Sequence, residues 1–216
     1  RNEPPKRYAV QAHEVMRDTE RWLRVTWPPA TELQVSAPHE LPCMLADPTQ
    51  VEQALFNLTT NAVHALGETR GLIRMEATLS MSEQRICDRL GLALGDSIVL
   101  SVHDHGPGLP PATLQRIFEP FFTTKPVGQG TGLGLAVVHG VMRTHGGAVD
   151  VHSQMGMGSS FTLYFPTTVD PDILADRPPS PPARSAISAV PPASATPQVD
   201  APKHATYRDA DQALVS

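Results

Sequence analysis

Hydrophobic residues recur with a helical period in some segments and with a strand period in others, and the two kinds of segment alternate along residues 8–166. This alternation predicts an α/β two-layer sandwich, in which a mixed sheet of about five strands is covered by about three helices. Asp47 and Pro48 suit the start of the central helix, and Gly67 suits its end. The expected helices cover residues 8–27, 48–66 and 133–145, with a shorter piece at 112–118, and the expected strands cover 31–37, 43–48, 71–81, 96–105, 148–154 and 159–166. Residues 82–95 show no pattern that we can assign.

Residues 169–216 differ in composition from the rest of the chain. They are rich in Pro, Ala and Ser, contain one aromatic residue and show no sustained periodicity. Such a segment buries too little apolar area to offset its chain entropy. We therefore expect residues 169–216 to be a disordered linker or tail.

Charge and cysteine content narrow the class of protein. A formal net charge of −5 provides no basic field for a nucleic-acid backbone, and no Lys/Arg-rich helix suggests a membrane surface. The two cysteines, Cys43 and Cys87, lack CxxC spacing, which argues against a zinc site or a disulfide framework. No apolar run reaches the roughly 18 to 20 residues that cross a bilayer. We expect a cytoplasmic segment without nucleic-acid or membrane contact, cut from a longer protein because it does not begin with Met, with any membrane anchor elsewhere in the parent.

The segment EQALFNLTTNAVHAL carries two stripes on one predicted helix. Asn57, Asn61 and His64 recur at i, i+4 and i+7 and so share a face. Amide oxygens are hard ligands that suit Mg²⁺, which completes its shell with water and substrate phosphates. The alternative is a solvent-facing set of polar residues. The predicted core stripe consists of Val51, Leu55, Leu58, Ala62 and Ala65.

Asp104 lies near the end of the predicted strand in SIVLSVHDHGPG. Alternation places its side chain in the apolar, core-facing row, where a carboxylate needs a hydrogen-bond donor. Gly106 and Gly108 allow a sharp turn and the close approach of a flat ligand. The simpler interpretation is an aspartate in a Gly-Pro-Gly turn. His103 and His105 point to the opposite face, but as a metal pair they lack a third ligand at a useful spacing.

A glycine-rich run, KPVGQGTGLGLAVVHG, leads into a predicted helix. Gly128, Gly130, Gly132 and Gly134 precede exposed backbone N–H groups that suit a phosphate at a helix start. The spacing fits neither a Rossmann fingerprint nor a Walker loop, and a glycine-rich hinge is the alternative. Lys125 is the nearest cation upstream that can reach a phosphate, although a solvated surface lysine is equally ordinary.

Five segments, NLTTNAVHA, DHGPG, FEPFF, GQGTGLGL and GMGSSF, occur in this order. Together they resemble the boxes of the catalytic and ATP-binding domain of two-component sensor histidine kinases, in the superfamily that also holds DNA gyrase B and MutL. The resemblance runs from Tyr8 to Pro166. It implies the Bergerat ATP-binding fold and ATP and Mg²⁺ as cofactors. It also implies a mobile lid over the triphosphate, which begins with the aromatic segment at residues 118–125 and ends with the glycines at 128–134.

The resemblance implies a role for each matching residue. Asn61 would ligate Mg²⁺, whereas Asn57 would contact the phosphates and the metal shell and, with Lys125, serve the transfer itself. Asp104 would accept a hydrogen bond from the adenine amino group, and Ser159 would help to hold adenine through water. The implied nucleotide-binding set is Asn57, Asn61, His64, Asp104, Gly106, Gly108, Leu109, Phe118, Lys125, Gly128, Gly130, Thr131, Gly132, Leu133, Gly134 and Ser159.

Two departures from the family pattern stand out. His64 occupies a position where many members carry a charged residue, which leaves its role open. No phosphoacceptor box occurs, because His13, which precedes an acid, falls in the segment that resembles the link to the catalytic domain. We expect residues 1–29 to be a linker helix from a missing dimerisation and phosphoacceptor hairpin, and residues 30–168 to be the catalytic domain.

Asn57 separates the kinases from the ATP-hydrolysing relatives, which carry a glutamate there as general base. An amide cannot take up a proton at neutral pH, and Glu52 lies more than two turns from Asn61. We therefore expect a phosphoryl donor to a histidine on a separate domain, with a response regulator or receiver domain as a further partner. An ATPase of the gyrase or MutL type and a non-catalytic ATP-sensing module remain the alternatives.

Overall fold

The computed structural model describes residues 7–67, 69–81, 84–93, 95–126 and 130–168. The predicted tail, 169–216, and the predicted site residue Gly128 lie outside the described residues. The strands are β1 (Tyr8–Val10), β2 (Thr31–Ser36), β3 (Cys43–Ala46), β4 (Gly71–Met81), β5 (Asp96–Asp104), β6 (Ala148–Gln154) and β7 (Gly158–Thr168). The helices are α1 (Ala12–Val25), α2 (Pro48–Leu66), α3 (Gln84–Leu90), α4 (Pro111–Leu114) and α5 (Gly134–Thr144). None of these helices combines the length and the apolar content needed to span a bilayer.

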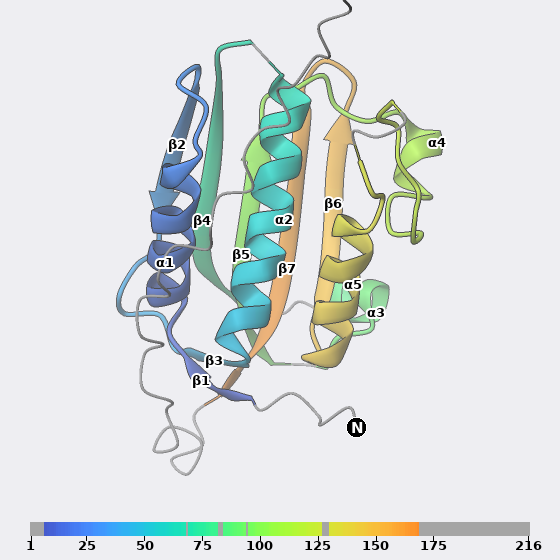
Figure 1. Cartoon of the computed structure of the whole chain (residues 1–216). Coiled ribbons are helices and arrows are strands. Elements are labelled where there is room, and N and C mark those ends of the chain that lie inside the picture. The colour runs from blue at the N-terminus through green and yellow to red at the C-terminus, as the bar shows by residue number, and fades with distance from the viewer. Residues whose placement is uncertain (1–6, 68, 82–83, 94, 127–129, 169–216) are drawn as a thin grey trace, which may run out of the picture. The chain divides into compact units, whose positions relative to one another are not determined.

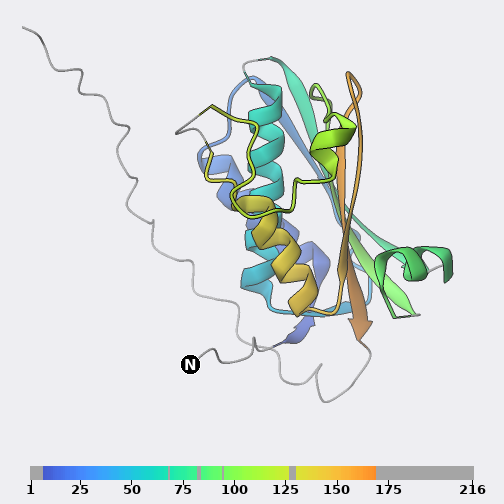
Figure 2. The same ribbon diagram turned by 90° about the vertical axis from the view of Figure 1, so that its right-hand side faces the viewer.

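The strands form one mixed sheet in the order β1-β3-β7-β5-β4-β2, with β6 also paired to β7. β2 runs parallel to β4, whereas the other pairs are antiparallel. Helices α1, α2 and α5 cover one face of the sheet, and α3 lies on the other side (Figures 1 and 2). This arrangement confirms the predicted two-layer α/β sandwich. The sheet has seven strands rather than about five.

The first predicted helix is shorter than expected and turned about its axis. Its first three residues form β1, which pairs with β3, because a three-residue strand is too short to show a period of its own. Apolar residues at helical spacing, Val10, Val15, Trp22 and Val25, predict its buried face. Trp22 and Val25 are instead exposed, Val25 to 78%. The buried residues of α1 are Ala12, Val15, Met16, Thr19 and Leu23, so Val15 lies on the buried face and Leu23 takes the place expected for Trp22.

Helix α2 has the predicted bounds and caps. The Asp47 carboxylate accepts hydrogen bonds from two backbone N–H groups of the first turn, and Gly67 follows the last turn with a φ of 61°. Ala65 was expected in the core and is exposed instead. Leu66 takes that place because its side chain folds over Gly71 at the start of β4. The other predicted core residues, Val51, Leu55, Leu58 and Ala62, are buried.

His145 joins the end of α5 to the start of α2. Its imidazole is 1% exposed, and Nε2 accepts a hydrogen bond of 2.9 Å from the backbone N–H of Asp47. Because an N–H group can only donate, Nδ1 carries the ring proton and donates to the Val141 carbonyl at 2.7 Å. The ring also meets Phe165 edge-on, with 5.8 Å between centroids.

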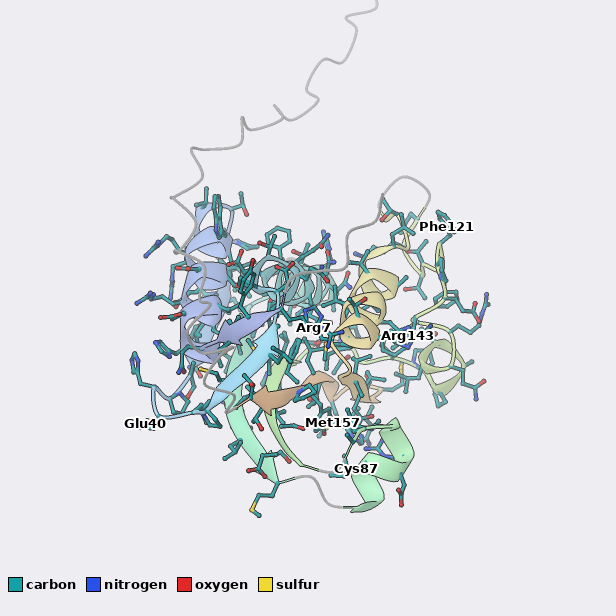
Figure 3. All side chains as sticks on the ribbon, turned by 90° about the horizontal axis from the view of Figure 1, so that it is seen from below. Arg7, Glu40, Cys87, Phe121, Arg143 and Met157 are labelled. Atoms are coloured by element: carbon teal, nitrogen blue, oxygen red, sulfur yellow. The ribbon has the colours of Figure 1, made fainter. Side chains whose placement is uncertain are left out.

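The segment that showed no pattern, residues 82–95, contains α3. The Arg89 guanidinium donates two hydrogen bonds to the Asp150 carboxylate on β6, at 3.0 and 2.7 Å. This pair lowers the pKa of Asp150, although burial alone would raise it. Cys87 of α3, labelled in Figure 3, is buried. This bidentate ion pair thus ties α3 to β6, on the side of the sheet that α1, α2 and α5 leave uncovered.

Candidate functional site

The polar stripe of α2 faces the start of α5. Asn57 and Asn61 are both half-buried. A Cβ atom built on Gly134, the first residue of α5, would lie 3.8 Å from the Asn57 amide carbon and oxygen. The first turn of α5, whose first backbone N–H groups have no partner within the helix, therefore lies within ordinary contact distance of the Asn57 amide.

Asp104 lies at the end of β5 and borders the last turn of α2. Its carboxylate is 7% exposed and accepts a hydrogen bond of 2.8 Å from the Gly106 backbone N–H. Burial raises the pKa of Asp104, and the backbone N–H groups of Gly106 and Ser159 oppose that shift. A Cβ on Gly106 would lie 2.8 Å from Asp104 Oδ1 and 3.2 Å from Ala65 Cβ. Ala65 is thus exposed because it faces this loop rather than the sheet.

Two glycines let the loop after β5 meet the β6–β7 hairpin. Gly108, with a φ of 71°, and Gly158, with a φ of 91°, both adopt conformations that side chains disfavour. A Cβ on Gly108 would overlap the Gln154 carbonyl, and one on Gly158 would overlap the Asp104 carbonyl. Both glycines are required by close backbone contact around Asp104.

Ser153 on β6, which is not among the predicted site residues, connects two that are, Leu109 and Ser159. Its hydroxyl oxygen accepts from the Leu109 backbone N–H at 2.8 Å and donates to the Gly158 carbonyl at 3.0 Å. The buried Ser159 hydroxyl lies 3.0 Å away and, because the Ser153 proton is in use, acts as the donor. Alternation along AVDVHSQ puts Ser153 on the face of Val149 and Val151, and that pattern alone could have indicated it.

The predicted lid region begins at Phe118, which packs partly on the core with its ring 5.5 Å from that of His139. Further along, the Phe121 N–H donates to the Gly132 carbonyl at 2.9 Å. Gly132 has a φ of 66°, and a Cβ there would overlap the Phe121 backbone. The Phe121 side chain is 75% exposed and lies at the margin of the molecule, on the segment beside α5 (Figure 3).

Lys125 reaches from this segment to α2. Its Nζ lies 3.0 Å from His64 Nδ1. Burial and the Lys125 charge lower the pKa of His64, and burial lowers the pKa of Lys125. A Cβ on Gly130 would lie 3.0 Å from the Thr123 hydroxyl and 3.1 Å from Lys125 Cδ. Thr131 Oγ1 accepts from the backbone N–H of Leu133 at 3.4 Å.

A cavity of about 490 Å³ lies on the opposite face of the sheet, although Asp104 and Ser159 border it. His103 and His105 are among its walls, because side chains alternate along β5. His103 Nε2 lies 3.0 Å from the Ser101 hydroxyl, and His105 Nδ1 lies 3.3 Å from the Leu72 carbonyl. Within the described part of the chain, no three His, Cys, Asp or Glu side chains converge as they would around a metal ion.

Comparisons with known proteins identify the family. Residues 46–169 match the family described as histidine kinase-, DNA gyrase B- and HSP90-like ATPase. Sensor histidine kinase ZraS of Escherichia coli K12 is 41% identical over 138 residues, which are 64% of this chain and 26% of ZraS. Sensor kinase CckA of Brucella abortus is 35% identical over 147 residues, 68% of this chain and 16% of CckA. The chain thus spans about a quarter or less of these relatives.

Solved structures give the same result. The catalytic domain of histidine kinase ThkA is 27% identical, with a TM-score of 0.57 over 74% of this chain and 95% of that one. Full-length ShkA in complex with AMPPNP is 29% identical, with a TM-score of 0.60 over 78% of this chain and 33% of that one. This chain belongs to the family of histidine kinase-, DNA gyrase B- and HSP90-like ATPases, and its domain is the catalytic and ATP-binding domain of a sensor histidine kinase.

Proposed function

We propose that this chain is the phosphoryl-donor domain of a sensor histidine kinase, which binds Mg-ATP and transfers its γ-phosphate to a histidine on a separate dimerisation domain. The observation that carries the proposal is the set of contacts along one face of α2. Asn57 faces Gly134, His64 contacts Lys125, and Ala65 borders the Gly106 loop that holds Asp104. These contacts suit a nucleotide lying along the helix, with its phosphates toward Asn57 and its base toward Asp104.

The adenine end of the proposed site depends on Asp104. A buried carboxylate with a spare acceptor oxygen suits the adenine amino group, which is a donor. Ser159 lies on the neighbouring strand directly opposite Asp104, and its hydroxyl is oriented by Ser153. Gly106, where a Cβ would lie 2.8 Å from Asp104 Oδ1, leaves the space beside the carboxylate free of a side chain.

The phosphate end depends on Asn57, Asn61 and Lys125. Two half-buried amides without a carboxylate beside them on α2 fit a Mg²⁺ ion that takes most of its negative ligands from the nucleotide. A bound Mg²⁺ ion neutralises charge on the phosphates. Asn61 would hold the ion, Asn57 would orient the phosphates against the start of α5, and the Lys125 ammonium would stabilise negative charge that develops during transfer.

The composition of α2 favours transfer over hydrolysis. Glu52 is its only acidic residue, nine positions before Asn61. Neither Asn57 nor Asn61 accepts a proton from water at neutral pH. In the proposed reaction, the domain positions the γ-phosphate and stabilises its charge, and the acceptor histidine comes from another domain.

The partners follow from the relatives. We infer a dimerisation and phosphoacceptor domain of the same parent protein, and a response regulator or receiver domain, because ZraS and CckA are sensor kinases. We also infer a cytoplasmic location for this segment, with residues 1–29 leading from the dimerisation hairpin and residues 30–168 forming the catalytic domain.

Calorimetry and a transfer assay test the proposal. The chain should bind Mg-ATP, release phosphate slowly on its own, and label a supplied dimerisation hairpin from ATP that is radioactive at its γ-phosphate. Asn61→Ala should weaken Mg-dependent binding by about tenfold or more, as expected for a lost metal ligand. Gln53→Ala, an exposed residue of the same helix, is the matched control and should not. Multiple-turnover phosphate release without a hairpin would favour the ATPase, and binding without transfer to any hairpin would favour the sensing module.

A further inference from the structure

We propose that His64 is a positioning residue, which holds the Lys125 ammonium over α2 one turn beyond Asn61. The purpose of this contact rests on the function proposed above, whereas the contact itself does not. The two residues are 61 positions apart, and their nitrogen atoms lie 3.0 Å apart.

The chemistry of the pair fixes the state of the imidazole. An ammonium can only donate, so His64 Nδ1 must be the unprotonated acceptor and Nε2 must carry the ring proton. The lowered pKa of His64, caused by burial and by Lys125, agrees with a neutral ring. His64 therefore spends its acceptor on Lys125 and keeps one N–H group.

Lys125 is also held from its own side. Its backbone N–H donates to the Thr123 hydroxyl at 3.1 Å, and its aliphatic stem packs where a Cβ on Gly130 would lie 3.1 Å from Cδ. A lysine with a fixed backbone and stem still has free rotation at its end, and this costs entropy when a phosphate orders it. A fixed acceptor on α2 removes part of that cost before the nucleotide arrives.

This assignment differs from direct phosphate binding by His64. If His64 touched the phosphates itself, its contribution to affinity would be independent of Lys125. If it acts by holding Lys125, its contribution should vanish when Lys125 is absent. A double-mutant cycle measures that difference.

The cycle uses the 216-residue chain and Mg-ATP affinity measured by calorimetry. We expect His64→Ala to weaken binding about three- to tenfold, the range for one partly exposed hydrogen bond to a charged group. The same substitution should have no further effect in Lys125→Met. His64→Asn should restore most of the affinity, because an amide oxygen can replace the Nδ1 acceptor. His152→Asn, at an exposed histidine on the other face of the sheet, is the matched control. Equal losses in both Lys125 backgrounds would overturn the assignment.

A second readout needs no nucleotide. Nitrogen NMR of the free chain should show His64 with an unprotonated Nδ1 and a protonated Nε2, and Lys125→Met should shift the Nδ1 signal. An Nδ1 signal that is protonated, or that ignores Lys125→Met, would overturn the contact. If Mg-ATP does not bind at all, the proposed function fails, while NMR still decides whether His64 holds Lys125. If Mg-ATP binds and the cycle shows no coupling, only the positioning role fails.

Discussion

Replacing His145 with alanine should destabilise the domain without touching the nucleotide site. The Asp47 backbone N–H would lose its acceptor, which costs about 1–3 kcal/mol for a buried donor. Loss of the edge-on contact with Phe165 adds about 0.5–1.5 kcal/mol. The Val141 carbonyl adds nothing, because it still accepts from the backbone N–H of residue 145. Allowing for partial exposure at Asp47, we expect a total of about 1.5–4 kcal/mol.

The pH dependence of this loss has a defined sign. Burial lowers the pKa of His145 below its ordinary value of 6.5. The unfolded chain therefore takes up a proton at a higher pH than the folded chain, so the imidazole stabilises the fold fully above pH 6.5 and progressively less below it. The stability difference between wild type and His145→Ala should shrink as the pH falls from about 8 to about 5.

Urea unfolding followed by circular dichroism measures both effects. Gln53→Ala, at an exposed position of α2, is the control and should change stability by less than about 0.5 kcal/mol at either pH. A loss below about 1 kcal/mol for His145→Ala at pH 8 would refute the account of the Asp47 hydrogen bond. A loss of the same size at both pH values would refute the assignment of a neutral ring.

Substitutions at Gly158 and Asp104 test the surroundings of Asp104, and Gly140→Ala serves as a comparison. Gly158→Ala should destabilise the fold by about 2 kcal/mol or more, because its Cβ would overlap the Asp104 carbonyl at a positive φ. Gly140→Ala, in α5 with no atom within 4 Å of the added Cβ, should instead stabilise by about 0.5–1 kcal/mol in the same urea titrations. Asp104→Asn should raise the melting temperature of the nucleotide-free chain at neutral pH, because the folded state raises the pKa of Asp104 and so disfavours its charged form. The same variant should lose the thermal shift caused by Mg-ATP, and an unchanged shift would contradict the role of Asp104 in binding adenine.

The sequence was sufficient for elements in which the periodic pattern continues over many residues. β4, β6 and α2 have the predicted bounds because eleven, seven and nineteen residues repeat a pattern several times. β1 and α3 escaped prediction for different reasons. β1 has only three residues, too few to show a period. α3 is tied to β6 by the Arg89–Asp150 pair, and local sequence does not reveal a contact between residues 61 positions apart. Trp22 was misplaced because it lies at the edge of the true apolar stripe.

The candidate site divides in the same way. Asn57, Asn61 and Asp104 can be grouped from the sequence because each lies within a short motif, and their roles remain predictions. Ser153 and the contact between His64 and Lys125 depend on which strands and loops meet in space. No spacing along the chain encodes those meetings, so they required the structure.

Strand β7 pairs with β5 near one end and with β3 near the other, so the domain has two distinct ends along this strand. Ser159, near one end of β7, lies opposite Asp104, whereas Thr168, at the other end, pairs with Cys43 on β3, which in turn carries β1 (Figure 1). Ser159 and Thr168 are nine positions apart along β7, a span of about 30 Å. Both ends of the described segment therefore meet at the pole remote from Asp104. Neighbouring domains can be attached there without obstructing the proposed nucleotide site, and tension applied at that pole would run lengthwise down one continuous strand toward Asp104.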